Sequence, residues 1–169
     1  MFPELGEEVA STTEAPHLRL ALEQSDRTAF PGGIVTLTAE VQLPPDVHVY
    51  APGTQDYKPI KLVIDPASEI ELRAAIYPAS KTLFLPAIKE RVPVFTGAFR
   101  IREDVKISSA AEFSNALGND GKPLTITGKL EYQACDSKIC FLPESVPVQW
   151  HVQALPLDRQ RAPEEIRHK

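Results

Sequence analysis

Proline is the residue that most constrains how this chain can fold. Sixteen prolines occur in 169 residues, against eight glycines, and they are spread along the whole chain. A proline has no backbone N–H and clashes with the preceding turn, so it breaks the interior of a helix. Prolines are tolerated at the ends of short strands and on sheet edges. The distribution therefore disfavours a helical bundle and favours short strands joined by turns.

An alternating pattern of side chains points to the same fold class. From position 35 to 43, apolar residues occupy the odd positions and threonine, glutamate or glutamine the even ones. This period of two is typical of a half-buried antiparallel strand. Further short strands are predicted, with turn signals about every ten residues, as in a sandwich or barrel. They cover residues 17–23, 47–51, 60–64, 69–76, 92–107 (broken near Gly97), 124–135 and 146–155.

The predicted fold class is all-β, with two packed antiparallel sheets in a single domain. A length of 169 residues suits one domain with a real core. Residues 1–16 are predicted to be a flexible arm, 17–155 the domain, and 156–169 a charged tail or linker. Residues 109–117, followed by Gly118, are compatible either with a short helix that the glycine ends or with a loop.

Charge and hydropathy exclude several classes of function. The net charge is -5 and no cluster of basic residues is present, which disfavours nucleic-acid binding. No apolar run approaches the roughly 18 residues of a membrane span. Residues 1–16 lack the basic and apolar segments of a signal peptide. Two interpretations stay open: a cytoplasmic protein, or the mature or trimmed part of an exported one.

Two cysteines, Cys135 and Cys140, carry the most specific chemical signal. They are the only cysteines in the sequence, and four residues separate them. Strand patterns on both sides predict a hairpin with residues 136–139 as its loop. Facing residues of such a hairpin have Cα atoms about 4.5–5.5 Å apart, and a disulfide tolerates about 4.4–6.8 Å. The sequence therefore predicts a disulfide at the tip of the hairpin.

This bridge is better suited to electron exchange than to stabilisation. Closing so short a ring stabilises a fold by on the order of 2 kcal/mol before strain, and exposed or strained bridges are the redox-labile ones. The alternative is a non-enzymatic immunoglobulin-like binding module whose hairpin disulfide is structural. Zinc needs about four ligands, and no histidine has ligand spacing to the cysteines, so neither a metal nor an organic cofactor is expected. The histidines are His17, His48, His151 and His168.

The alternation of residues 124–134 predicts which way the first sulfur points. Even positions such as Tyr132 are apolar, and Cys135 falls with the polar odd positions, so Cys135 is predicted to face solvent. The prolines Pro143 and Pro147 interrupt the pattern after the hairpin, so no orientation follows for Cys140. Trp150 and Tyr132 fall on apolar parity and are predicted to lie in the core.

The cysteine segment also resembles a known family. Residues 132–135 (Tyr-Gln-Ala-Cys), then Cys140, an aromatic residue and Pro143, resemble the N-terminal periplasmic domain of the thiol:disulfide interchange protein DsbD family. The resemblance covers most of residues 17–155 and implies an immunoglobulin-like fold. It implies a periplasmic protein-disulfide reductase that takes electrons from a membrane-embedded partner through a thioredoxin-like domain. The implied acceptors are periplasmic disulfide proteins, including isomerases and cytochrome c maturation factors.

The resemblance also assigns roles to individual residues. Cys135 and Cys140 match the redox pair, and the family's second cysteine forms the mixed disulfide, which points to Cys140. Tyr50 resembles the aromatic strand residue that packs near the pair. Phe84, in residues 81–85, is the nearest candidate for the aromatic of the cap loop that shields the disulfide. The acidic pair usually found beside that aromatic is absent here.

Overall fold

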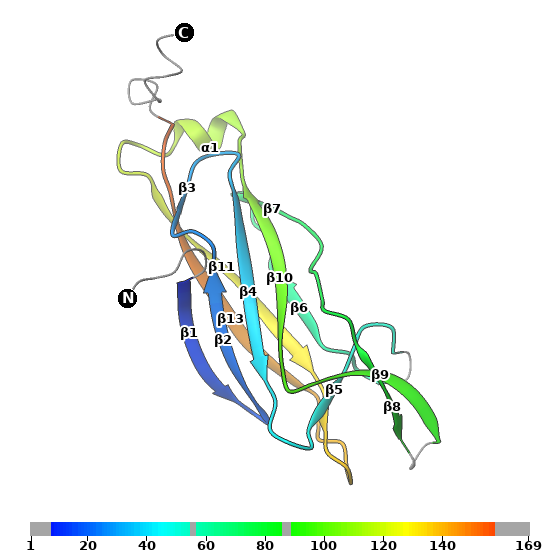
Figure 1. The fold of residues 1–169 in the computed structure, drawn as a ribbon. Helices are drawn as coiled ribbons and strands as arrows, with labels where there is room; N and C mark the ends of the chain where they lie inside the picture. Colours follow the sequence, from blue (N-terminus) through cyan, green and yellow to red (C-terminus); the bar gives the residue numbers. More distant parts are fainter. Residues whose placement is uncertain (1–7, 55–56, 86–88, 158–169) are drawn as a thin grey trace.

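A computed structural model describes residues 8–54, 57–85 and 89–157 of the chain (Figure 1). Nearly all of its regular structure is extended, and the predicted all-β class is confirmed. Within the described residues the strands are β1 (Glu8–Ala15), β2 (Leu18–Gln24), β3 (Thr28–Ala29), β4 (Ile34–Gln42), β5 (His48–Tyr50), β6 (Lys61–Ile64), β7 (Ile70–Leu72), β8 (Lys81–Leu85), β9 (Glu90–Thr96), β10 (Ala98–Ile107), β11 (Lys122–Tyr132), β12 (Ala134–Cys135) and β13 (Glu144–Ala154), and the helix is α1 (Ala111–Asn115).

The strands form three sheets. One has the order β1-β2-β4-β10-β7 and a second has the order β3-β13-β11-β6. These two are the layers of the sandwich in Figure 1, and the pairings are antiparallel except for the short contact between β13 and β3. A third, smaller sheet, β12-β5-β9-β8, lies at one end.

The third sheet was not predicted, and it arises because two long extended segments change sheets along their length. Residues 90–107 break at Gly97, whose φ of 69° lies in the left-handed region that glycine tolerates. On one side of Gly97, β9 pairs with β5 and β8; on the other, β10 pairs with β4 and β7. Residues 122–135 divide in the same way into β11 and β12.

The core between the two large sheets is apolar, and two aromatic residues predicted for it are fully buried. Trp150 and Tyr132 are each 0% exposed. The Trp150 indole N–H donates a hydrogen bond to the carbonyl of Glu23 at 2.9 Å, and the Tyr132 hydroxyl donates one to the carbonyl of Pro16 at 2.6 Å. Burial of an aromatic ring with its polar atom satisfied stabilises the sandwich without an unpaired donor.

The predicted flexible arm differs from the structure over residues 8–15. This segment forms β1, which pairs with β2 in the register Ala15↔Leu18 to Glu8↔Gln24. It is an edge strand whose residues 11–14 are exposed, so no alternation of apolar and polar residues marks it. Residues 1–7 and 158–169, which include most of the predicted tail, lie outside the described residues.

Of the two alternatives left open for residues 109–117, the structure contains the short helix, α1, and Gly118 follows it with a φ of 71°. No helix in the described ranges is long and apolar enough to span a membrane.

Candidate functional site

The predicted disulfide between Cys135 and Cys140 is present. The two sulfurs are 2.08 Å apart and the two Cα atoms 3.9 Å apart, closer than the predicted separation. Backbone hydrogen bonds from Asp136 N to Ile139 O at 2.9 Å and from Phe141 N to Ala134 O at 2.8 Å lie on either side of the pair. The cysteines therefore occupy a non-hydrogen-bonded position of the hairpin, where facing residues approach most closely.

The loop of this hairpin is held by the Asp136 side chain. Its Oδ1 atom accepts hydrogen bonds from the backbone N–H groups of Lys138 at 2.7 Å and Ile139 at 2.8 Å. Both bonds lower the pKa of the Asp136 carboxyl, and the bond from Ile139 has the larger effect. An aspartate that bonds to its own backbone two and three residues on favours a tight turn, so the sequence itself closes the loop that brings the two sulfurs together.

The two cysteines differ in exposure, and the prediction that Cys135 faces solvent is wrong. Cys135 is 1% exposed and Cys140 is exposed. Alternation fails because the chain changes sheets at Gln133, which belongs to neither β11 nor β12. The two consecutive residues Ala134 and Cys135 are therefore both buried. Ala134 packs against the sandwich core, and Cys135 packs against the third sheet.

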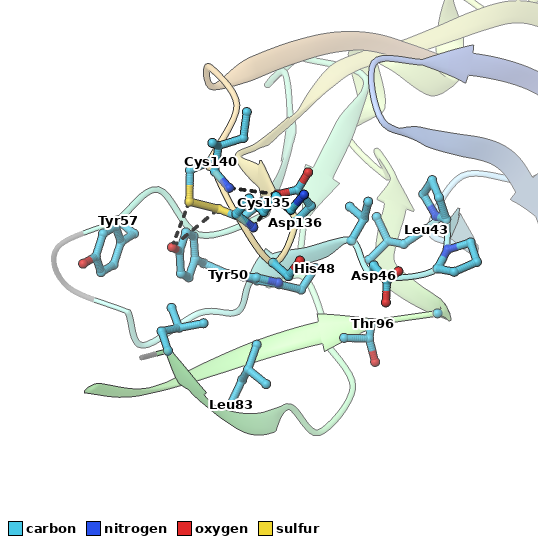
Figure 2. A pocket seen from close by; sticks show the side chains of 18 of the residues that line it. Leu43, Asp46, His48, Tyr50, Tyr57, Leu83, Thr96, Cys135, Asp136 and Cys140 are labelled. Carbon is cyan, nitrogen blue, oxygen red and sulfur yellow. Dashed lines mark hydrogen bonds between the residues drawn. A yellow bond between two sulfur atoms is a disulfide. The ribbon is translucent and has the colours of Figure 1, made fainter. Parts of the chain in front are cut away.

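Tyr50 lies against both sulfurs (Figure 2). Its Oη atom is 3.4 Å from Cys140 Sγ and 3.5 Å from Cys135 Sγ. A disulfide sulfur carries no hydrogen, so the tyrosine hydroxyl is the donor. The Tyr50 ring is 1% exposed and stacks on Tyr57 with centroids 4.7 Å apart. Burial, and then the proximity of Tyr57, raises the pKa of Tyr50, so the hydroxyl keeps its proton at neutral pH.

His48 belongs to the same site, although sequence reasoning considered it only as a metal ligand. It pairs directly with Cys135 across β5 and β12, is 6% exposed, and meets the edge of the Tyr50 ring at a centroid distance of 5.8 Å. Its Nε2 atom has no hydrogen-bond partner among the described residues. Burial lowers the pKa of His48, and the nearby Asp136 carboxylate partly offsets this. Its place two residues before Tyr50, on the same strand face, was the available signal.

A cavity of about 900 Å³ opens onto this group of side chains. Its walls come from β5, β8, the 43–47 segment and the cysteine hairpin (Figure 2). Cys135, Cys140, Tyr50 and His48 all line it. The disulfide therefore lies at the wall of a largely apolar recess.

The predicted cap residue Phe84 also lines the cavity, but it is 48% exposed. Residues 81–85 form strand β8, paired with β9, rather than a loop. Leu83 and Leu85 pack against the cluster that contains Tyr50 and Cys135. Strand alternation directs Phe84 to the opposite face, where the Arg91 guanidinium lies 5.9 Å from its ring centroid. Shielding of the disulfide by Phe84 stays a prediction.

No group of three or more His, Cys, Asp or Glu side chains that could hold a metal ion occurs within the described residues. His168 lies outside them.

Comparisons with known proteins identify the family. The family described as thiol:disulfide interchange protein DsbD, N-terminal, matches residues 20–149. The chain belongs to this family. The match lies inside the predicted domain of residues 17–155, whose own boundaries stay a prediction. No match was found among curated protein sequences.

Two solved structures of N-terminal domains are similar to this chain. The N-terminal periplasmic domain of ScsB from Proteus mirabilis aligns with a TM-score of 0.55 at 12% identity, over 98% of this chain and 60% of that chain. The DsbD N-terminal domain of Neisseria meningitidis, in its reduced form, aligns with a TM-score of 0.42 at 16% identity, over 75% of this chain and 86% of that one. The chain thus spans less than two thirds of the Proteus mirabilis chain. That likeness shows the shared immunoglobulin-like fold.

Proposed function

We propose that this chain is a thiol–disulfide exchange module that passes two electrons through the Cys135–Cys140 pair. The observation that carries the proposal is the asymmetry of the bridge: Cys135 is buried, Cys140 is exposed, and both line an apolar cavity. A disulfide that only stabilises the fold needs neither an exposed cysteine nor a cavity beside it. Membership of the DsbD N-terminal family supports the same function.

The exchange needs two displacements at sulfur. In the reduced protein the Cys140 thiolate attacks a disulfide of the partner, forming a mixed disulfide and releasing one partner sulfur as a thiolate. The Cys135 thiolate then attacks Cys140 Sγ, re-forming the internal bridge and releasing the second partner sulfur. The partner gains two electrons and the module loses two. Cys140 is the attacking residue because Cys135 is 1% exposed and beyond the reach of a partner.

The proposed electron donor is a thioredoxin-like domain supplied by a membrane-embedded partner, and the proposed acceptors are periplasmic disulfide proteins. On this proposal the chain acts within a periplasmic protein-disulfide reductase system, as the family description and the periplasmic Proteus mirabilis relative suggest. Two apolar side chains of the hairpin, Ile139 at 57% and Leu142 at 79% exposed, offer contact area to such a partner. Exposed apolar surface of this kind is a common mark of a protein-binding site.

Trapping of the mixed disulfide tests this function. Cys135→Ser leaves Cys140 without a resolving thiol, so the variant should accumulate a covalent adduct with a thioredoxin-like domain, visible on non-reducing electrophoresis. The matched control, Cys135→Ser with Cys140→Ser, should form no adduct. Because the ring closed by the disulfide is short, the free energy of unfolding of both variants should lie within about 2 kcal/mol of the wild-type value. Thermal melting measures this difference.

The structural-bridge alternative predicts the reverse pattern. A double variant that fails to fold, together with a single variant that traps nothing, would assign the disulfide to stability. The reduction potential separates the two functions independently, because structural bridges lie below about −300 mV and exchange bridges above it.

A further inference from the structure

The His48 imidazole is a buried polar group that has no role in the two displacement steps of the exchange reaction. It is 6% exposed, it lines the cavity, and its Nε2 atom has no hydrogen-bond partner within the described part of the chain. A buried polar atom left unpaired destabilises the folded protein. Such an atom in a site lined by reactive groups calls for a chemical explanation.

His48 and Cys135 lie face to face. They are direct partners across the antiparallel pair of β5 and β12. Directly opposed residues have Cβ atoms about 4.5–5.5 Å apart and point to the same face of the sheet. Tyr50, two residues along β5, shares that face, and its hydroxyl lies 3.5 Å from Cys135 Sγ. Figure 2 shows His48 beneath the cysteine hairpin, on the side of Tyr50.

Cys135 needs a base that neither of its other polar neighbours supplies. A thiol buried in apolar surroundings resists ionisation, yet Cys135 must become a thiolate to resolve the mixed disulfide. Tyr50 stays protonated because burial raises its pKa, so it donates and does not accept. The Asp136 carboxylate is a weak base because its hydrogen bonds to the loop backbone lower its pKa. Among the described residues that pack around Cys135, the remaining basic atom is on the imidazole of His48.

We propose that His48 is the base that accepts the Cys135 proton when Cys135 resolves the mixed disulfide; this inference rests on the proposed exchange function. The proton passes from Cys135 Sγ to the His48 imidazole as the sulfur attacks Cys140 Sγ. The Cys135–Cys140 bond forms, the bond from Cys140 to the partner breaks, and the partner sulfur leaves with the electron pair. When the bridge is reduced, the imidazolium returns the proton to the departing Cys135 sulfur.

The charges around His48 are consistent with this role. On the hairpin, the Asp136 carboxylate faces the imidazole and favours its charged form, while burial favours the neutral form and dominates. On β9, the residue paired with His48 is Thr96, whose hydroxyl accepts a hydrogen bond from the Lys81 ammonium at 3.4 Å. The Tyr50 ring packs against the imidazole at an interplanar angle of 85°, and Asp46 lines the same cavity. With its pKa below the usual 6.5, the imidazole is neutral at pH 7 and free to accept a proton.

Ring closure can be measured without a physiological partner, by mixing the reduced protein with excess dithiobis(nitrobenzoate) in a stopped-flow instrument. The first equivalent of coloured thiolate reports attack by Cys140, and the second reports closure by Cys135. In His48→Gln the second phase should be roughly 10²-fold slower at pH 7, which is within the usual contribution of a positioned base. The first phase should be unchanged. His151→Gln, an exposed histidine on β13, is the matched control.

The pH profile supplies a readout that a purely structural role would not change. Closure in the wild type should be nearly independent of pH above the pKa of His48. In His48→Gln it should rise about tenfold per pH unit with the Cys135 thiolate fraction. Superimposable second phases for wild type and variant would overturn the inference, even if partner trapping through Cys140 succeeds. Should His48→Gln not fold, the wild type decides: an NMR titration of His48 whose pKa does not coincide with that of ring closure would also overturn it.

Discussion

Among the individual residues of the site, Tyr50 has the closest contact with the reacting sulfurs. Its hydroxyl lies 3.4 Å from Cys140 Sγ and its burial keeps it protonated. Hydrogen bonds donated to an anion favour the charged form, so the same hydroxyl stabilises a Cys140 thiolate after reduction. Tyr50 would then lower the pKa of the attacking thiol, while a role for Tyr50 in shielding the bridge stays a prediction.

The variant Tyr50→Phe tests this contribution in the reduced protein. The pKa of the Cys140 thiol should rise by about one unit, equivalent to about 1.4 kcal/mol, as followed by the ultraviolet absorbance of the thiolate against pH. Tyr57→Phe is the control, since Tyr57 stacks on Tyr50 while the Tyr50 hydroxyl, kept in that variant, supplies the hydrogen bond to the sulfurs. An unchanged thiol pKa in Tyr50→Phe would show that the hydroxyl does not act on the thiolate.

At the scale of single residues, the sequence predicts that the Cys135–Cys140 disulfide forms, but it does not predict which cysteine is buried. Two cysteines four residues apart between strand patterns were sufficient to predict the hairpin and the bridge. Which sulfur is buried depends on where the chain leaves one sheet for another, at Gln133. That break is set by the pairing of β12 with β5, which lies more than eighty residues earlier in the chain. The local alternation of apolar and polar residues therefore cannot predict it.

Among the elements, β8 forms the wall of the cavity opposite the hairpin, and its alternation decides which side chain covers the disulfide. Leu83 and Leu85 pack towards Tyr50 and Cys135, whereas Phe84 is 48% exposed beside Arg91. An apolar side chain packed over a bridge slows its reduction because it obstructs the approach of a thiolate.

We therefore expect Leu83→Ala to speed reduction of the bridge by dithiothreitol several-fold, and Phe84→Ala to speed it less. Reduction can be followed by quenched alkylation of the released thiols, with melting curves to verify that both variants keep the fold. If Phe84→Ala accelerates reduction as much as Leu83→Ala does, the predicted shielding by Phe84 is supported and the ranking by strand face is wrong.

Strong periodic patterns made most strands predictable, while edge strands and strand pairing were not. The alternation of residues 35–43 corresponds to β4, in the middle of a sheet with one buried face. Residues 11–14 of β1 are exposed and show no alternation, and residues 81–85, which form β8, were assigned to a cap loop from the family resemblance. The site itself unites β5, β8, β9 and β12, so recognising His48 required strand pairings that act over long sequence distances.

At the scale of the whole molecule, the sandwich anchors the cysteine hairpin through the turn between β1 and β2. The Tyr132 hydroxyl bonds to the Pro16 carbonyl, and the His17 ring stacks on Phe141 with centroids 3.8 Å apart. Both contacts lie within a few residues of the cysteines along the chain. The hairpin is thereby fixed at one end of a rigid two-layer body, with its loop and the cavity left open to a partner.

The ionisation of Glu103, a buried carboxyl group of the same two-layer body, should make the stability of the protein depend on pH. Glu103 lies on the inward face of β10 between Ile101 and Val105, and it is 5% exposed. Burial raises the pKa of Glu103 to about 7, well above its value in an unfolded chain. Because the folded-state pKa is raised, Glu103 contributes its full stability to the folded protein below the unfolded pKa of about 4.3. This contribution to the free energy of unfolding is lost as the pH rises through about 7.

Glu103→Gln replaces this carboxyl with a neutral side chain of the same shape and should remove the penalty of ionisation. The free energy of unfolding of the variant should exceed that of the wild type by about 1–3 kcal/mol at pH 8 and should match it near pH 4. Urea titrations at the two pH values measure the difference. Glu71→Gln, on the exposed side of β7, should show no such gap, because its carboxylate stays in water. A constant difference between Glu103→Gln and the wild type across this pH range would mean that the pKa of Glu103 is the same in the folded and the unfolded protein, and that burial does not raise it.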